Sequence, residues 1–267
     1  MNEKTERLEN IIREMGSVVI AFSSGVDSTF LLKVAHDAIG DKCIAVTAKS
    51  EFFPARESEE AELFCRQEGI RQIFFDSDQL ESESFASNPA DRCYHCKLDL
   101  FRHMKRIASD NGIKYVADGS NVDDEGDYRP GLKALQELGI RSPLKEAGFT
   151  KPEIRMESER LGLASYNKQP FACLASRFPY GEMITAEKLK KVEAAEETLR
   201  QLGLGQYRVR IHQDTLARIE VAKEGIQTVV DNRDMINARL SDIGFKYICV
   251  DLKGYRSGSM NEVLEKK

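Results

Sequence analysis

The chain has 267 residues, of which 41% are hydrophobic and 31% charged, and its net charge is −5. This length favours one larger and one smaller domain, and the composition is sufficient for buried cores, which excludes a disordered chain. The acidic balance argues against an extended nucleic-acid surface.

The N-terminal segment MNEKTERLENIIREM is charged throughout and lacks the apolar region of a secretory signal, and no later segment resembles a membrane span. We therefore expect a cytoplasmic protein with no membrane partner. Six cysteines do not indicate a disulfide scaffold in a chain of this size, because clustered cysteines in a reducing compartment are more typical of metal binding or catalysis.

Apolar segments alternate with helical patterns over the first half of the chain, after an amphipathic helix that begins the sequence. Short apolar strands between helices are typical of a parallel sheet covered on both faces, which binds ligands at the carboxyl ends of its strands. The predicted strands are 17–22, 43–48, 70–75 and 113–119, and the predicted helices are 28–39, 55–68 and 97–109.

The pattern weakens between Ser120 and Tyr180, where Gly, Pro and charged residues surround one predicted helix at 151–161. Loops of this length tend to be functional. A helix, two strands, a further helix and a last strand then indicate a small α+β domain. We predict an α/β domain over residues 1–180, which includes the cysteine site, and a substrate-binding or oligomerisation domain over 181–267.

The first predicted strand leads into the sequence SSGVDS at residues 23–28, which opens a helix. Such a turn is suited to phosphate, because the first N–H groups of a helix have no intrahelical partner and its dipole is positive there. Ser23, Ser24 and Ser28 add hydroxyl donors, and small residues such as Gly25 let the backbone approach an anion. The loop matches neither the Walker motif nor the dinucleotide fingerprint.

Asp27 would repel a phosphate bound at this helix start. Mg²⁺ coordinated by both carboxylate and phosphate oxygens would turn the repulsion into binding. The alternative is that Asp27 only caps the helix.

The stretch SSGVDS resembles the S-G-G-V-D-S pattern of the PP-loop ATP pyrophosphatases, which cleave ATP between the α and β phosphates and adenylate a substrate. The resemblance implies that Ser23, Ser24, Gly25, Asp27 and Ser28 bind ATP with Mg²⁺. Ser24 stands where the family has glycine. If this position requires a positive φ, Ser24 adopts it at a cost in strain.

Cys93 and Cys96 form a C-x-x-C pair, and Cys173 stands alone in ACLASRFPYG. Such a pair fits a metal half-site, a redox pair or coincidence, although the thioredoxin-like context of a redox pair is absent. Zinc would need a fourth ligand, and only His95, between the two cysteines, is at hand. Three thiolates better suit a [4Fe–4S] cluster with one open iron.

The remaining cysteines, Cys43, Cys65 and Cys249, lie in apolar segments and are expected to be free and buried. Cys173 has an alternative role, because the nearby Arg177 would lower its pKa and favour nucleophilic attack on an adenylated carboxylate. That attack forms a thioester.

Three features together resemble the LarE family: the SSGVDS loop, the stretch DGSNVDDEGDYRPGLKALQELGIRSPLKEAG, and ACLASRFPYG followed by RVRIH. Its members are ATP-dependent sulfur transferases of nickel-pincer nucleotide synthesis, which serves lactate racemase and related enzymes. The resemblance covers nearly the whole chain. It implies that ATP adenylates a carboxylate of pyridinium-3,5-biscarboxylic acid mononucleotide and that sulfur replaces the activated oxygen.

The family resemblance implies two routes for sulfur. In one, a cysteine at the position of Cys173 gives up its own sulfur and becomes dehydroalanine. In the other, three cysteines hold a [4Fe–4S] cluster that presents an additional sulfide. Cys93 and Cys96 favour the second route, with Cys173 as the third ligand and the sacrificial Cys173 as the alternative. The resemblance also suggests an external sulfide donor and a homo-oligomer, with a hexamer as one option.

Arg208 and Arg210 alternate with Val209 and Ile211 on a predicted strand, so both arginines point to one face and the apolar pair to the core. Two guanidiniums on one face form an anion clamp or, alternatively, part of a salt-bridged surface strand. The resemblance suggests that they meet a phosphate or carboxylate of the substrate, with Arg177 as a further candidate.

Other functions fit parts of the same pattern. PP-loop enzymes of tRNA thiolation also carry C-x-x-C pairs, but they need a basic RNA-binding surface, against which the acidic balance argues. A PP-loop amidotransferase would need ammonia and has no use for three cysteines. A non-catalytic nucleotide-binding module would keep the loop and release no pyrophosphate.

Overall fold

The computed structural model describes residues 3–124, 130–170 and 172–264. The chain divides into two compact units, the first comprising Met1–Asp78 and Cys93–Pro170, and the second comprising Gln79–Arg92 and Phe171–Lys267. The second unit thus includes a short segment from the first half of the chain, which no sequence pattern indicated. The chain divides near residue 170, whereas the predicted domains were bounded at residue 180.

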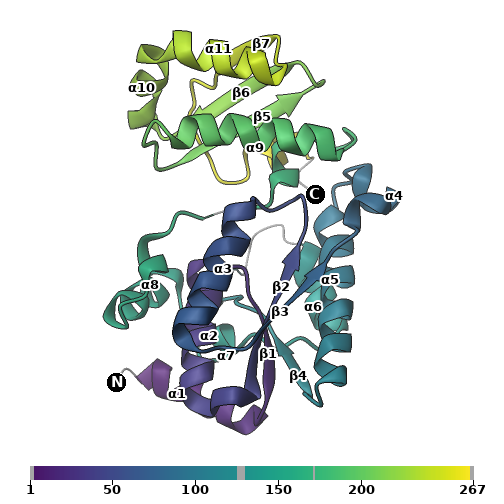
Figure 1. Ribbon diagram of the computed structural model, residues 1–267, viewed down its shortest axis with the longest axis vertical. Coiled ribbons are helices and arrows are strands. Elements are labelled where there is room, and N and C mark those ends of the chain that lie inside the picture. Colours follow the sequence, from purple (N-terminus) through teal and green to yellow (C-terminus); the bar gives the residue numbers. More distant parts are fainter. Residues whose placement is uncertain (1–2, 125–129, 171, 265–267) are drawn as a thin grey trace. The chain divides into compact units, whose positions relative to one another are not determined.

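The first unit is built on a sheet of four parallel strands in the order β3-β2-β1-β4 (Figure 1). Successive connections run from β1 to β2 and β3 on one side, while β4 lies on the other side of β1. This reversal creates a topological switch point at the carboxyl ends of β1 and β4, where sheets of this kind bind ligands. The strands are β1 (Val18–Ala21), β2 (Cys43–Lys49), β3 (Gln72–Asp76) and β4 (Tyr115–Ala117).

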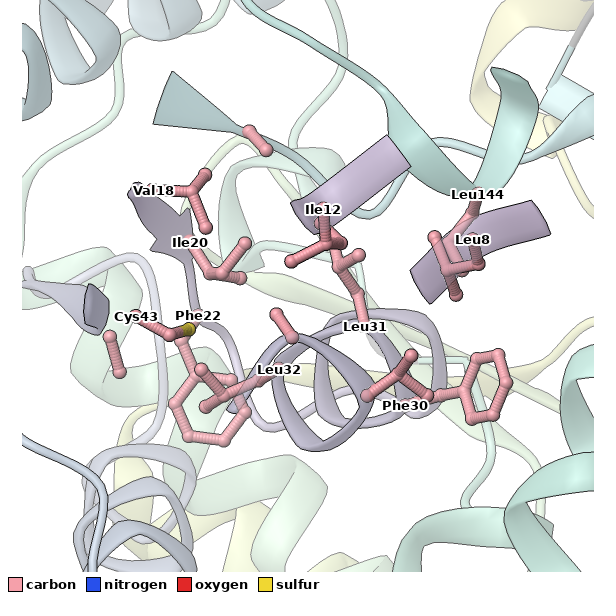
Figure 2. Packing of buried hydrophobic residues seen from close by; sticks show 14 of the residues in the cluster. Leu8, Ile12, Val18, Ile20, Phe22, Phe30, Leu31, Leu32, Cys43 and Leu144 are labelled. Atoms are coloured by element: carbon pink, nitrogen blue, oxygen red, sulfur yellow. The ribbon is translucent and has the colours of Figure 1, made fainter. Parts of the chain in front are cut away.

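Successive residues of β1 point to opposite faces of the sheet, and both sets are apolar. Helices therefore cover both faces. Val18 and Ile20 pack in a cluster with Leu8 and Leu31, which lie on two helices of one face (Figure 2). Val19 belongs to a second cluster on the other face, which includes side chains of α5 and α6. The helices of this unit are α1 (Glu3–Met15), α2 (Val26–Ile39), α3 (Ala55–Glu68), α5 (Arg92–Asp110), α6 (Pro130–Glu137), α7 (Pro143–Glu146) and α8 (Lys151–Arg160).

The second unit has a sheet of three strands in the order β5-β6-β7, in which β5 and β6 are antiparallel and β6 and β7 parallel. Helices α9 and α11 pack against it. The predicted α/β class, a parallel sheet with helices on both faces plus a smaller α+β unit, is confirmed. The elements are α4 (Glu83–Ala86), α9 (Ala186–Arg200), β5 (Tyr207–His212), β6 (Leu216–Val221), α10 (Ile226–Asp231), α11 (Arg233–Ile243) and β7 (Tyr247–Val250).

The cysteines outside the proposed site differ in exposure. Cys43 and Cys65 are buried as predicted, and burial raises the pKa of each thiol to about 12. The prediction that Cys249 is buried is wrong, because this residue is exposed. It lies on β7, an edge strand of which alternate residues, Tyr247 and Cys249, face solvent. No helix in the described ranges is long and apolar enough to cross a membrane.

The core of the first unit provides a test of the fold. Leu31 is fully buried on α2, so Leu31→Ala should lower the free energy of unfolding by about 3 kcal/mol, through lost burial and a residual cavity. Leu63→Ala on α3 is the matched control because Leu63 is 51% exposed, and its effect should stay within about 0.5 kcal/mol. Urea denaturation followed by circular dichroism measures both. Equal losses in the two variants would contradict the assigned packing.

Candidate functional site

The SSGVDS loop connects β1 to α2 at the switch point of the parallel sheet. Gly25 is the N-cap residue of α2 and has an extended backbone conformation. Being glycine, it has no side chain to accept a hydrogen bond from the first N–H groups of the helix. The hydroxyl of Ser28 donates to the carbonyl of Gly25 at 3.2 Å and lies 3.2 Å from the hydroxyl of Ser23. The start of this helix of 14 residues therefore combines backbone N–H groups, hydroxyls and a positive dipole, which suits an anion.

Asp27 lies in the first turn of α2 but does not cap it, so the capping alternative is wrong. Its Oδ2 atom accepts a hydrogen bond from the ammonium of Lys151 at the start of α8. Its Oδ1 atom is buried and has no hydrogen-bond partner within the described ranges. Burial raises the pKa of Asp27, and Lys151 partly offsets the shift. A buried carboxylate oxygen without a partner fits a ligand of a hard cation such as Mg²⁺.

Gly119, in the loop after β4, approaches the start of α2 closely. A Cβ atom built on Gly119 would lie 3.1 Å from the backbone nitrogen of Ser28 and 3.3 Å from the Cβ of Asp27. Sequence reasoning missed this glycine, although its place just after the strand beside β1 was a usable signal. Lys151 gave no such signal, because it lies 124 residues from Asp27 in the chain.

Ser24 does adopt a positive φ, 53°, at the position where the family pattern has glycine. Its side chain is buried, and its hydroxyl donates to the carbonyl of Glu57 at 3.1 Å and to its carboxylate at 3.2 Å. The ammonium of Lys168 donates to the Ser24 hydroxyl at 3.2 Å and to the Glu57 carboxylate at 2.7 Å. These contacts hold the loop to α3 and offset the strain of the backbone.

Cys93 and Cys96 lie on the first turns of α5, which begins at Arg92, five residues before the predicted start at residue 97. The helix starts directly after the turn-forming sequence NPAD at residues 88–91. Residues at i and i+3 share one side of a helix. Cys93 is exposed, Cys96 is half-buried, and neither forms a disulfide. The pair is therefore suited to bind one metal centre.

Cys173, in the second unit, is half-buried at the N-cap of a short 3₁₀ helix, Leu174–Arg177. Arg177 is fully buried and binds the carboxylate of Glu196 on α9 with two hydrogen bonds of 2.7 and 2.8 Å. Its remaining nitrogen donates to the carbonyls of Ala172 at 2.7 Å and Cys173 at 3.2 Å. This ion pair fixes the backbone around Cys173.

The three thiols of the proposed cluster belong to different units, Cys93 and Cys96 to the first and Cys173 to the second. Within the described residues, no group of three or more His, Cys, Asp or Glu side chains is arranged to hold a metal ion. The three-cysteine site stays a prediction.

Arg208 and Arg210 are buried on β5, as are Val209 and Ile211, so this strand is covered on both faces and is not a surface strand. Arg210 binds the carboxylate of Glu220 at 2.7 and 3.0 Å and donates to the carbonyl of Ser176 at 3.0 Å. It therefore contacts the 3₁₀ helix that follows Cys173.

The guanidinium of Arg208 lies over the ring of Tyr255, 5.3 Å from its centroid. Burial, together with the nearby Arg177, lowers the pKa of Arg208 to about 10. The side chain remains a cation at neutral pH, and an anion bound beside it would reduce the cost of burying that charge.

Comparison with known proteins gives relatives over the whole chain, although no protein-family model matches it. An uncharacterized protein of Synechocystis is 42% identical over 268 residues, which cover 100% of both chains. The pyridinium-3,5-bisthiocarboxylic acid mononucleotide synthase of Lactiplantibacillus plantarum is 39% identical over 264 residues, 98% of this chain and 95% of that protein. A glutamine-hydrolysing GMP synthase of Aeropyrum pernix is 26% identical over 225 residues, 75% of this chain and 44% of that protein.

Two substitutions of Ser24 separate backbone strain from hydroxyl bonding. Ser24→Ala keeps the cost of a positive φ and loses the bonds to Glu57, so it should lower the free energy of unfolding by about 1–2 kcal/mol. Ser24→Gly loses the same bonds but relieves the strain, so it should be more stable than Ser24→Ala by about 1 kcal/mol. Thermal denaturation ranks the variants. Equal stability of the two would show that Ser24 is not strained.

Proposed function

The chain belongs to the LarE family, that of pyridinium-3,5-bisthiocarboxylic acid mononucleotide synthase, and from this premise we propose that it is an ATP-dependent sulfur transferase. The resemblance inferred from the motifs is thereby confirmed. We propose that the substrate is pyridinium-3,5-biscarboxylic acid mononucleotide and that a carboxylate becomes a thiocarboxylate. The observation that carries the adenylation step is the SSGVDS loop at the switch point, with the buried carboxylate oxygen of Asp27 beside it.

ATP is proposed to bind with its phosphates at the start of α2, where Ser23, Gly25 and Ser28 offer N–H or hydroxyl donors. Ser24 would contribute its backbone N–H, because its hydroxyl is bonded to Glu57. Asp27 would hold Mg²⁺, which neutralises phosphate charge and favours departure of pyrophosphate. In the absence of nucleotide, the ammonium of Lys151 balances the same carboxylate. The similarity to a GMP synthase supports a PP-loop nucleotide site.

The substrate's anionic groups are proposed to meet Arg208 and Arg210. Arg210 binds Glu220 and the carbonyl of Ser176, so it is oriented by two fixed partners. Arg208 is buried beside it on the same strand, where its guanidinium donates to the carbonyl of Tyr207 at 2.6 Å and lies over the ring of Tyr255. That Arg177 also meets substrate remains a prediction, since the bonds of its guanidinium described above hold the Cys173 loop.

The proposed reaction has two steps. A substrate carboxylate oxygen attacks the α-phosphorus of ATP, pyrophosphate leaves, and an acyl adenylate forms. A sulfur nucleophile then adds to the acyl carbon, and AMP leaves with the original carboxylate oxygen. We propose that Cys93, Cys96 and Cys173 ligate a [4Fe–4S] cluster, which would supply the sulfide. On α5, Cys93 is exposed and Cys96 half-buried, one helical turn apart, which fits two thiolate ligands of one centre.

Loss of the Asp27 carboxylate tests the nucleotide site. Asp27→Asn should lower pyrophosphate release from ATP, Mg²⁺ and the pyridinium dicarboxylate by about 100-fold or more, because a cation ligand is lost. Pyrophosphate is measured by a coupled assay. Unchanged release in Asp27→Asn would refute the assigned role, and no release from the wild type under any condition would refute adenylation.

The same variant has a predicted effect on stability. Because burial raises the pKa of Asp27, ionising this group costs folding free energy, and the cost grows as pH rises from 3.8 through the raised pKa. Asn avoids the cost. Nucleotide-free Asp27→Asn should therefore gain stability relative to the wild type between acidic and neutral pH, measured as a difference in Tm at several pH values. A difference independent of pH would contradict the raised pKa.

Iron analysis tests the source of sulfur. Anaerobically purified wild type should contain about four iron and four sulfide per chain, and Cys93→Ala should lose both. Cys249→Ala is the matched control, because Cys249 is also exposed but lies outside the proposed site. If wild type instead lacks iron and loses the mass of one H₂S from Cys173 after turnover, the sacrificial route is correct.

A further inference from the structure

The sheet of the second unit has one open edge. Its strand order is β5-β6-β7, so β5 and β7 are the two edge strands of this sheet. Side chains of β5 are buried up to its last residue, whereas those of β7, which lies beside α11 (Figure 1), are alternately exposed and half-buried. An edge strand that is not covered presents unpaired N–H and C=O groups, which can pair with a strand of another chain.

The hydrogen bonds of β7 show which of its backbone groups are unpaired. The N–H groups of Tyr247 and Asp251 donate to carbonyls of β6 and of the residue just before it, at 3.0 and 2.8 Å. Backbone groups of successive residues in a strand alternate in direction, so those of Ile248 and Val250 point away from β6. Among the described residues, no strand pairs with this side of β7.

β7 lacks the features by which proteins usually protect an open edge. Its sequence is YICV, with no charged residue and no proline. Tyr247 is 66% exposed, and Leu252, just after the strand, is 86% exposed. Pairing at this edge would therefore cover apolar side chains as well as satisfy backbone groups.

A groove of about 360 Å³ lies beside the same edge, between β7 and the helices α10 and α11. Of the ten residues that line it, only Arg233 and Asp234 are charged. Their side chains are 70% and 91% exposed and lie 3.7 Å apart. One cation and one anion leave the groove without net charge, which disfavours a strongly acidic or basic partner. A second copy of this surface is complementary, because Arg233 of each copy can pair with Asp234 of the other.

We propose that β7 is a dimer interface, at which the strands of two copies pair antiparallel across a twofold axis. Residues directly opposite in such a pair have backbone groups that point either toward each other or away from each other. The register that uses Ile248 and Val250 of both copies therefore pairs Ile248 of each with Val250 of the other. The axis then passes between the two Cys249 residues, which face each other as a non-hydrogen-bonded pair with Cα atoms about 4.5 Å apart.

This pairing occupies the open edge of both copies, so the interface closes and does not extend into a fibre. Formation of the dimer requires no nucleotide, substrate or iron. Its tests therefore give the same result whether or not the proposed reaction is correct.

Disulfide formation at Cys249 tests the register, because a Cα separation of about 4.5 Å is within the range of disulfides. Cys93, Cys96 and Cys173 are changed to serine in the full chain. Diamide should then oxidise two Cys249 thiols to an intermolecular disulfide and take up the two electrons and two protons. Non-reducing gel electrophoresis should show a covalent dimer. Tyr247→Cys with Cys249→Ser is the matched control: this thiol is on the same face of β7 but away from the axis, so it should give little dimer.

The mass of the reduced protein is the second measurement. Sedimentation of wild type should give an even multiple of the chain mass, 30.2 kDa. Cys249→Lys should at least halve this mass, because two like charges would face each other at the axis. Cys249→Ser changes the same exposed position without adding charge and should keep the mass of wild type.

Three results would overturn the proposal. The first is a monomeric wild type. The second is equal cross-linking of the Cys249 thiol and of the control thiol at position 247. The third is an oligomer that Cys249→Lys does not dissociate, which would show that the copies associate through another surface.

Discussion

The carboxylate of Asp27 is the constraint around which the first unit is arranged. A half-buried anion at the start of α2 must be balanced, and Lys151 does so from α8, far along the chain. Gly119 permits the loop after β4 to pass within van der Waals distance of the same turn. Ser24 fixes the preceding backbone to α3. Among the described residues, one carboxylate oxygen of Asp27 has no hydrogen-bond partner, which costs stability in the free protein and suits a cation that arrives with its nucleotide.

In the second unit, buried ion pairs position the backbone of one loop. Arg177 with Glu196 and Arg210 with Glu220 are almost completely desolvated, so the cost of removing the charges from water offsets most of their attraction. Their geometry is specific, however, because each arginine also binds backbone of the segment 172–177. The pairs therefore define where the Cys173 loop lies. In the proposed function, the fixed position of the Cys173 loop matters more than its contribution to stability, because a sulfur donor must be presented in one orientation.

Much of the fold followed from the sequence because its strands are short apolar runs between helices. The run VVIA predicts β1 well, since both faces of that strand are buried. Long-range partners were not predicted, because nothing in the local sequence near Lys151 or Lys168 indicates what each side chain contacts. Cys249 was misplaced because an apolar run does not show whether a strand is central or at an edge. Ser24 was identified as unusual from its position alone, and only its contacts with Glu57 explain it.

The central claim, that sulfur comes from a renewable cluster rather than from the chain, is tested most directly by isotope labelling. The reconstituted protein is supplied anaerobically with ATP, Mg²⁺, the pyridinium dicarboxylate and isotopically heavy sulfide. After several turnovers, mass spectrometry measures the masses of both the product and the protein chain. The account predicts heavy sulfur in the thiocarboxylate and an unchanged mass of the chain. Light sulfur in the product, with a chain lighter by one H₂S at Cys173, would contradict it.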